Sequence, residues 1–161
     1  MNRILFTLLI SAFLLPLGCN GQKRPDGMPK LMPCAITIQQ DGAPVSDATI
    51  LLTAKNGDCP WVVSGTTDTT GTAKIQTHSL YNGAPAGVFT VTVEKTESTA
   101  EKSDVEKLTK PYEVYSLVAK EYTDKTTSPL ELTIEKKAVT QTFDLGPACR
   151  ILLMKINPNE F

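Results

Sequence analysis

The sequence of 161 residues contains very little histidine: His78 is its only one. It has no CxxC pair, and a zinc site needs about four nitrogen or sulfur ligands. It also has none of the GxSxG, HExxH and phosphate-loop patterns that accompany several large enzyme classes. We therefore predict no catalytic residue, no metal ligand, no cofactor and no enzymatic activity. His78 is interpreted as a residue at the end of a strand.

The sequence also lacks an excess of basic charge. Its 16 Lys and Arg against 17 Asp and Glu give a net charge of −1, and no basic patch stands out. Nucleic-acid binders usually carry such a patch, so we expect no nucleic-acid partner. Aromatic residues are few, at 6%, while threonine is abundant and apolar residues come in short alternating stretches. That composition favours strands over helices.

No apolar run is long enough to cross a bilayer as a helix, which takes roughly 20 residues. The longest, residues 4–15, is interrupted by Thr7 and Ser11 and follows a positive charge at Arg3. A short apolar core after a positive residue is typical of a signal peptide, which is removed and takes no part in the fold.

The end of this run, Leu15-Pro16-Leu17-Gly18-Cys19, resembles the lipobox of bacterial lipoproteins. The resemblance implies a signal peptide over residues 1–18, cleavage before Cys19, and lipid, including acyl chains such as palmitate, on Cys19. Two or three acyl chains would hold the protein stably to a membrane. An ordinary secretory signal followed by a chance cysteine is the alternative interpretation.

Residues 19–31 are expected to form a polar tether between the lipid and a domain over residues 32–161. Asn20 follows the cysteine, where an aspartate often signals inner-membrane retention in enteric bacteria. We therefore expect a location in the cell envelope, anchored in the outer membrane.

Alternation of apolar and polar residues predicts an antiparallel-rich, all-β sandwich of about seven to eight strands. Asp41-Gly42 and the Asp68 to Gly71 segment are expected turns. The predicted strands are residues 35–40, 49–54, 61–67, 72–77, 87–95, 130–136, 140–145 and 151–156. The side chains expected inside are Ile36, Ile38, Ile50, Leu52, Ile75, Phe89, Val91, Val93, Leu132, Ile134 and Phe143.

Residues 96–128 interrupt this pattern. Residues 97–110 are highly charged and expected in solvent, whereas Val114, Leu117, Val118 and Tyr122 have the spacing of one apolar face of a short helix. We expect a helix or turn that docks on the sheet, with a lid over a binding site as the alternative.

Three cysteines remain after Cys19, and an exported protein meets oxidising conditions. Cys34 begins the first predicted strand and Cys59 follows the second, so both are expected near one end of the sandwich. We predict a Cys34–Cys59 disulfide, with Cys149 free or as the alternative partner.

The chain contains the ordered pattern DGxPVxxA, TDxxG and PAGxFxVxV, beginning at Asp41, Thr67 and Pro85. This order resembles the carboxypeptidase regulatory-like domain of small bacterial lipoproteins. Three later segments, Glu121-Tyr122, Ser128-Pro129-Leu130 and Phe143-Asp144-Leu145, resemble the closing part of the same proteins. The resemblance implies an Ig-like, prealbumin-like (transthyretin-like) sandwich. It says almost nothing about activity, because one fold serves many functions.

The expected function is that of a lipid-anchored, non-enzymatic structural or interaction module that contacts an envelope protein or glycan. A carbohydrate- or peptide-binding module is the alternative, with stacking by Trp61, Tyr81, Tyr112 and Tyr115. Their exposure on one concave surface would favour it. An enzyme of unknown class would need polar residues that converge from distant parts of the chain.

Overall fold

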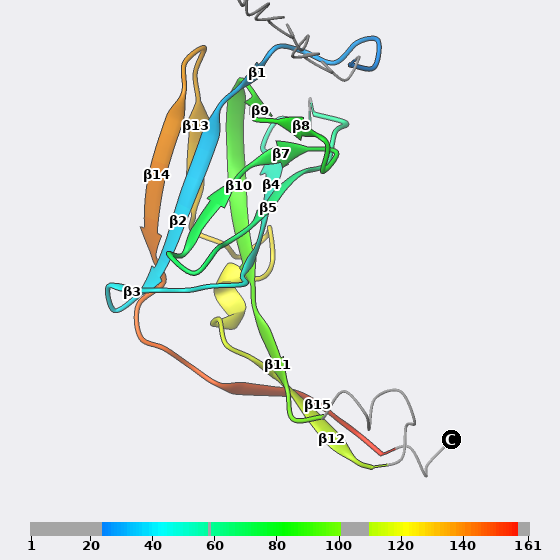
Figure 1. The fold of residues 1–161 in the computed structure, drawn as a ribbon, viewed down its shortest axis with the longest axis vertical. Coiled ribbons are helices and arrows are strands. Elements are labelled where there is room, and N and C mark those ends of the chain that lie inside the picture. The colour runs from blue at the N-terminus through cyan, green and yellow to red at the C-terminus, as the bar shows by residue number, and fades with distance from the viewer. Residues whose placement is uncertain (1–23, 58, 101–109, 158–161) are drawn as a thin grey trace, which may run out of the picture.

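The computed structural model describes residues 24–57, 59–100 and 110–157, and they form an all-β structure (Figure 1). The predicted signal peptide, Cys19 and residues 101–109 lie outside the described residues. The strands are β1 (Leu31–Met32), β2 (Cys34–Gln40), β3 (Ala43–Pro44), β4 (Thr49–Ala54), β5 (Val63–Thr66), β6 (Thr72–Lys74), β7 (Gln76–Thr77), β8 (Tyr81–Asn82), β9 (Ala84–Pro85), β10 (Gly87–Glu94), β11 (Thr96–Ser98), β12 (Tyr112–Ser116), β13 (Glu131–Ile134), β14 (Val139–Asp144) and β15 (Ile151–Ile156).

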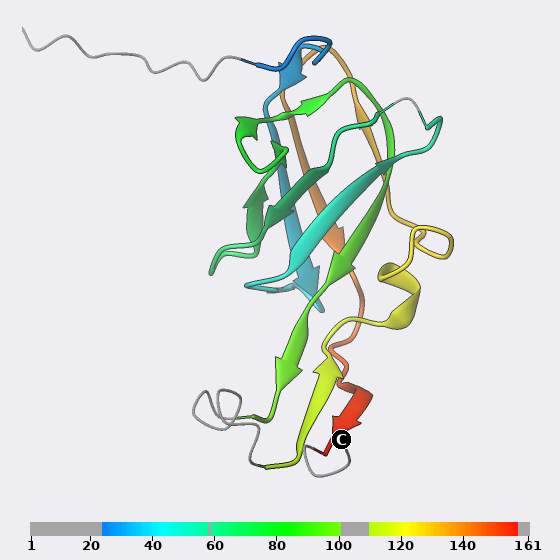
Figure 2. The same ribbon diagram turned by 90° about the vertical axis from the view of Figure 1, so that its right-hand side faces the viewer.

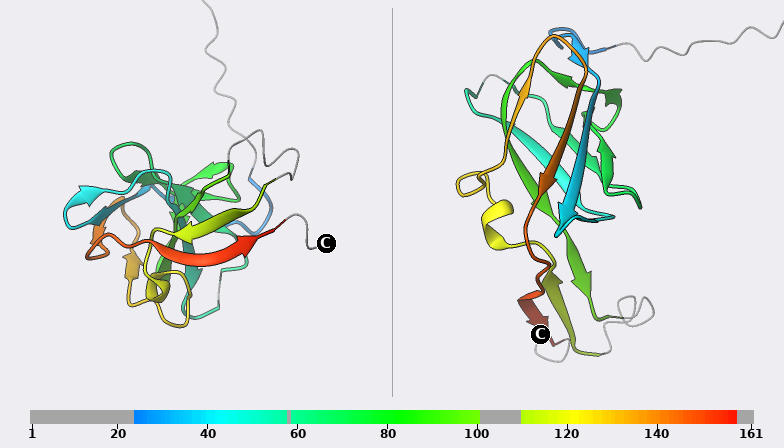
Figure 3. Two further views of the ribbon diagram at one scale, coloured as in Figure 1. Left: turned by 90° about the horizontal axis from the view of Figure 1, so that it is seen from below. Right: turned by 90° about the vertical axis from the view of Figure 1, so that its left-hand side faces the viewer.

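Two larger sheets enclose the core, and β1 and β9 form a separate two-stranded sheet. The larger has the strand order β13-β10-β4-β5-β7-β8, and the smaller has the order β14-β2-β3 with β6 also paired to β2. The pairs within the larger sheet are antiparallel, whereas β14 and β2 are parallel neighbours (Figure 3, right). The predicted sandwich, rich in antiparallel pairs, is therefore confirmed.

Each predicted strand overlaps an observed one, but residues 72–77 divide into two. β6 pairs with β2 in the small sheet, and β7 pairs with β5 in the large sheet. Between them lies Ile75, which is buried and whose N–H donates to the carbonyl of Cys34 at 2.9 Å. The chain thus changes sheets at a core residue, which local alternation cannot reveal.

The core lies between the facing sheets. Every side chain predicted inside is buried except Phe143, which is half-buried and packs against the core cluster. Ile36 and Ile38 of β2 contribute from one sheet, and Phe89, Val91 and Val93 of β10 contribute from the other. Full burial of one such side chain contributes about 1.5–3 kcal/mol relative to leaving it in water.

The Asp41-Gly42 turn joins β2 to β3 with positive φ at both residues, 48° and 76°. Such a turn matches the twist of antiparallel strands and favours Asp-Gly. The carboxylate of Asp144 accepts the N–H of Asp41 at 3.2 Å and that of Gly42 at 3.0 Å. The end of β14 therefore stabilises the first hairpin, although the two segments are far apart in the sequence.

The second predicted turn is held by its own aspartate. Asp68 Oδ1 accepts the N–H groups of Thr70 at 2.8 Å and Thr72 at 3.1 Å. Together with a bond from the Thr70 hydroxyl, the largest cause, these bonds hold the pKa of Asp68 below its usual value. At Gly71, where φ is +74°, a Cβ would lie 2.6 Å from the carbonyl oxygen of Ile38. Glycine is thus required there for both backbone shape and space.

A further sheet, of order β11-β12-β15, extends beyond one end of the sandwich (Figures 1 and 2). The predicted helix with Val114 on its apolar face is wrong, because residues 112–116 form β12, hydrogen-bonded on both sides to β11 and β15. Cross-strand pairing outweighs the helical spacing of the apolar residues. Among the described residues of this segment, helical structure is limited to a single 3₁₀ turn, Lys120–Tyr122, and buried Val118 precedes it.

Thr67 links two of the sequence motifs through a buried hydroxyl. It accepts the N–H of Ala48 at 2.8 Å and donates to the carbonyl of Val45 at 2.7 Å.

We predict that Thr67→Val, which keeps the shape of the side chain, lowers the free energy of unfolding by about 1–3 kcal/mol, because it leaves a buried N–H unpaired. Urea denaturation measures the effect. Thr66→Val, at an exposed neighbour, is the control, and equal stability of the two variants would contradict the assignment.

Candidate functional site

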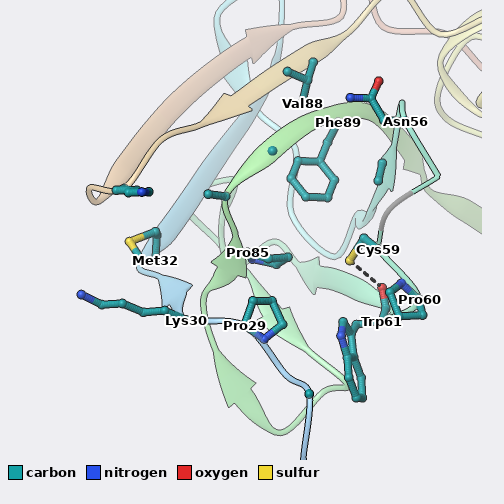
Figure 4. A pocket seen from close by; sticks show the side chains of 15 residues that line it. Pro29, Lys30, Met32, Asn56, Cys59, Pro60, Trp61, Pro85, Val88 and Phe89 are labelled. Carbon is teal, nitrogen blue, oxygen red and sulfur yellow. Dashed lines mark hydrogen bonds between the residues drawn. The ribbon is translucent and has the colours of Figure 1, made fainter.

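A pocket of about 750 Å³ lies at the end of the sandwich where the chain enters β1 (Figure 4). Its walls come from residues around β1, from the connection between β4 and β5, from the start of β10, and from Lys136 beyond β13. Ligand pockets typically measure about 300–1,000 Å³. This one therefore has the size of a site for a small organic molecule.

Apolar side chains form most of the wall. Phe89 is almost completely buried, Met32 is buried, and half-buried Trp61 lies beside Pro60 (Figure 4). The Trp61 ring meets the ring of His78 edge-on, with 5.2 Å between centroids. A large apolar wall with a few polar groups is the usual composition of a ligand site.

Two cations also line the pocket, Lys30 and Lys136. Both are exposed, and neither forms an ion pair with any described residue. The described lining residues include no carboxylate. The neighbouring Lys137 differs, because its ammonium pairs with Glu135 at 2.8 Å. The described part of the pocket therefore combines an apolar wall with uncompensated positive charge.

Of the four aromatic residues considered for ligand stacking, only Trp61 is among the described residues that line the pocket. Trp61 lines the pocket, Tyr81 lies in β8, and Tyr112 and Tyr115 lie in β12 within the extending sheet. Tyr112 and Tyr115 point to opposite faces, since strand residues alternate. The Arg150 guanidinium covers the Tyr115 ring at 3.5 Å. The described lining of the pocket therefore does not bring two or more of these aromatic side chains onto one concave surface.

The outer strand of the extending sheet exposes an apolar run. Ile151, Leu152, Leu153 and Met154 are 42%, 52%, 52% and 51% exposed. β15 pairs with β12 on one side and ends the sheet on the other. The charged side chains at the two ends of this run already have ion-pair partners. Arg150 donates to Glu97 at 2.9 Å, and the Lys155 ammonium lies 3.5 Å from the Glu113 carboxylate. This strand is the second candidate surface.

His78 occupies a turn after β7, with φ of 55°, and is exposed. Its interpretation as a strand-end residue is correct. In the described parts of the chain, no three His, Cys, Asp or Glu side chains gather where they could hold a metal ion. None of the helical structure among those residues has the length and apolar character needed to span a bilayer.

Cys34, Cys59 and Cys149 have free thiols in the structure. Cys34 is buried in the core, and burial raises the pKa of its thiol to about 11. Cys59 lines the pocket, where its thiol donates to the carbonyl of Trp61 at 3.5 Å. The Cys34–Cys59 disulfide is thus not formed here, and it stays a prediction for the oxidised protein.

We predict that iodoacetamide alkylates Cys59 at least about ten-fold faster than Cys34 in the reduced native protein, because the thiolate is the nucleophile and burial suppresses it at Cys34. Peptide mass spectrometry at about pH 8, below the ordinary thiol pKa, measures both rates. Unfolding the protein in urea should make the two alkylation rates equal. Equal rates in the native protein would contradict the burial of Cys34, and non-reducing mapping that joined Cys149 to either partner would overturn the predicted pairing.

The sequence matches no protein-family model and no curated protein, and no solved structure matches it. Evidence for the function of this chain therefore comes from its own sequence motifs and from the geometry of the pocket and of β15.

Proposed function

We propose that this protein is a lipid-anchored lipoprotein of the bacterial cell envelope whose non-enzymatic β-sandwich binds a partner protein through β15. The exposed apolar run of Ile151 to Met154 on an open sheet edge is the observation that carries the proposal. The motif order that begins at Asp41 supports membership of the carboxypeptidase regulatory-like family.

Evidence for the lipid anchor lies in the sequence that precedes the described residues. A positive residue, a short apolar core and Gly18-Cys19 follow one another as in lipoprotein precursors. The chain then enters the fold at β1, and the extending sheet projects from the opposite end of the molecule (Figure 1). A protein tethered by Cys19 would therefore present β15 away from the anchored end. By the same sequence argument at Asn20, the anchoring membrane is the outer membrane.

A protein strand suits β15 better than a glycan does. An unpaired edge carries free backbone N–H and C=O groups, and strand addition uses these for affinity and the side chains for specificity. Exposed apolar side chains would then contact the partner. Glycan binding usually needs open aromatic faces, but the ring of Tyr115 is covered by Arg150.

A non-enzymatic role is supported by what the carboxylates of the motifs do. Asp68 accepts bonds from its own turn, and Asp144 accepts bonds from the Asp41-Gly42 turn. The hydrogen bonds and lowered pKa of Asp68 suit a fixed structural acceptor rather than a proton carrier.

We predict that Cys19→Ala abolishes labelling by an alkyne analogue of palmitate and moves the protein from the membrane fraction to the soluble fraction. The physical reason is that loss of the acyl chains removes the apolar surface that partitions into the bilayer. Cys149→Ala is the matched control and should label like the wild type. Unchanged membrane retention of Cys19→Ala, with no label on the wild type, would refute the anchor.

For the binding strand, we predict that Leu153→Glu reduces recovery of cross-linked partner at least about ten-fold, because the interface would have to bury an unpaired charge. Leu80→Glu is the control, since Leu80 is 56% exposed on another part of the molecule. Cross-linking in intact cells, followed by peptide mapping, identifies the contact. Sedimentation of the purified protein tests for a second copy as the partner. Equal recovery with both variants would overturn the assignment of β15.

A further inference from the structure

We infer that the pocket beside Trp61 is a binding site for an amphiphilic carboxylate, a small molecule with an apolar body and one anionic head. This inference is independent of the lipid anchor and of partner binding by β15. It rests on the apolar wall of the pocket and on two lysines without an acidic partner among the described residues.

The apolar body is indicated by the walls. In Figure 4 the side chains of Met32, Phe89 and Trp61 lie around Pro85, whereas Val88 projects from the other face of β10. Burial of apolar surface contributes about 25 cal/mol per Å². The volume of about 750 Å³ leaves room for a phenyl group or an alkyl chain with its linker.

The pocket is built from constrained backbone. Pro29, Pro60 and Pro85 all line it, and proline fixes its own φ. Pro85 belongs to β9, which pairs with β1 through Leu31 and Met32. These prolines and the β1–β9 pairing restrict the backbone of part of the wall, which lowers the ordering cost of binding.

The anionic head is indicated by Lys30 and Lys136. Lys30 lies on the side of Met32, away from Trp61 (Figure 4). Lys136 comes from the connection between β13 and β14, which is fixed near β1 because the N–H of Val139 donates to the carbonyl of Pro33 at 2.9 Å. Both ammonium groups are solvated, so each contributes modestly to binding of an anion. Two of them select an anion over a neutral molecule of the same shape.

Fluorescence can test the site directly, because Trp61 is the only tryptophan in the chain. The full chain carrying Cys19→Ala, which removes the proposed lipid acceptor, is purified without detergent. It is titrated with phenylbutyrate, phenylbutanol and phenylbutylamine, which share one apolar body and differ in charge. We expect saturable changes in Trp61 emission, with phenylbutyrate bound about ten-fold more tightly than the alcohol and the amine bound most weakly.

The lysines are tested by the double variant Lys30→Gln with Lys136→Gln. Its affinity for phenylbutyrate should fall to that for phenylbutanol, while the affinity for the alcohol stays the same. Lys137→Gln is the matched control: Lys137 follows Lys136 directly, pairs with Glu135 and does not line the pocket. It should leave the preference for the acid unchanged.

Cys59 provides a second readout in the same pocket. Bound phenylbutyrate should slow its alkylation several-fold, whereas the rate at Cys149, which is not among the lining residues, should not change. Equal affinity for the acid and the alcohol would overturn the assignment of an anionic head. Absence of both a saturable emission change and protection of Cys59 would overturn the site itself. Either result leaves the tests of Cys19 and β15 unaffected.

Discussion

The alternation of side chains along β10 is the constraint on which the rest of the structure depends. Phe89, Val91 and Val93 are buried, and the strand pairs with β4 on one side and β13 on the other. Its first residues reach the pocket, and the chain beyond its last residue continues into β11 of the extending sheet. One strand thus connects the core to both candidate surfaces, so a change that displaced β10 would disturb all three.

The sequence motifs acquire a physical meaning once their hydrogen bonds are known. Asp144 holds the Asp41-Gly42 hairpin, Thr67 holds the backbone at Ala48, and Gly71 leaves room for the carbonyl of Ile38. Each motif therefore fixes how one turn meets another part of the chain. This explains why the pattern predicts a sandwich well and carries little information about ligand or reaction.

The predicted core omitted several buried residues, among them Met32, Val63 and Val118. Strands with a long one-sided alternation were predictable from the sequence, and so were the core side chains that those strands bury. β9 was not, because two residues such as Ala84 and Pro85 have no pattern of their own and become a strand only by pairing with β1. β12 was misinterpreted because the spacing of Val114, Leu117 and Val118 also suits a helix. The pairing that decides between the two comes from β15, more than 30 residues later in the chain.

The pocket could not be predicted from the sequence, for a related reason. Lys30, Trp61, Phe89 and Lys136 belong to four separate segments, and only the packing of those segments places them together. Trp61 was singled out as a large aromatic residue, but its proposed companions Tyr112 and Tyr115 lie in the extending sheet. The two lysines carried no local signal, since isolated exposed lysines are common on any protein surface.

The parallel pairing of β14 with β2 gives the molecule a mechanical property. β2 leads away from the N-terminal end, and β14 runs beside it toward the extending sheet (Figure 1). If the protein is anchored near its N-terminus and gripped at β15, tension pulls these neighbours past each other along their length. Their pairs, from Val139 with Cys34 to Asp144 with Gln39, would then share the load together rather than open one after another. Under those attachments the sandwich would resist being stretched along this direction.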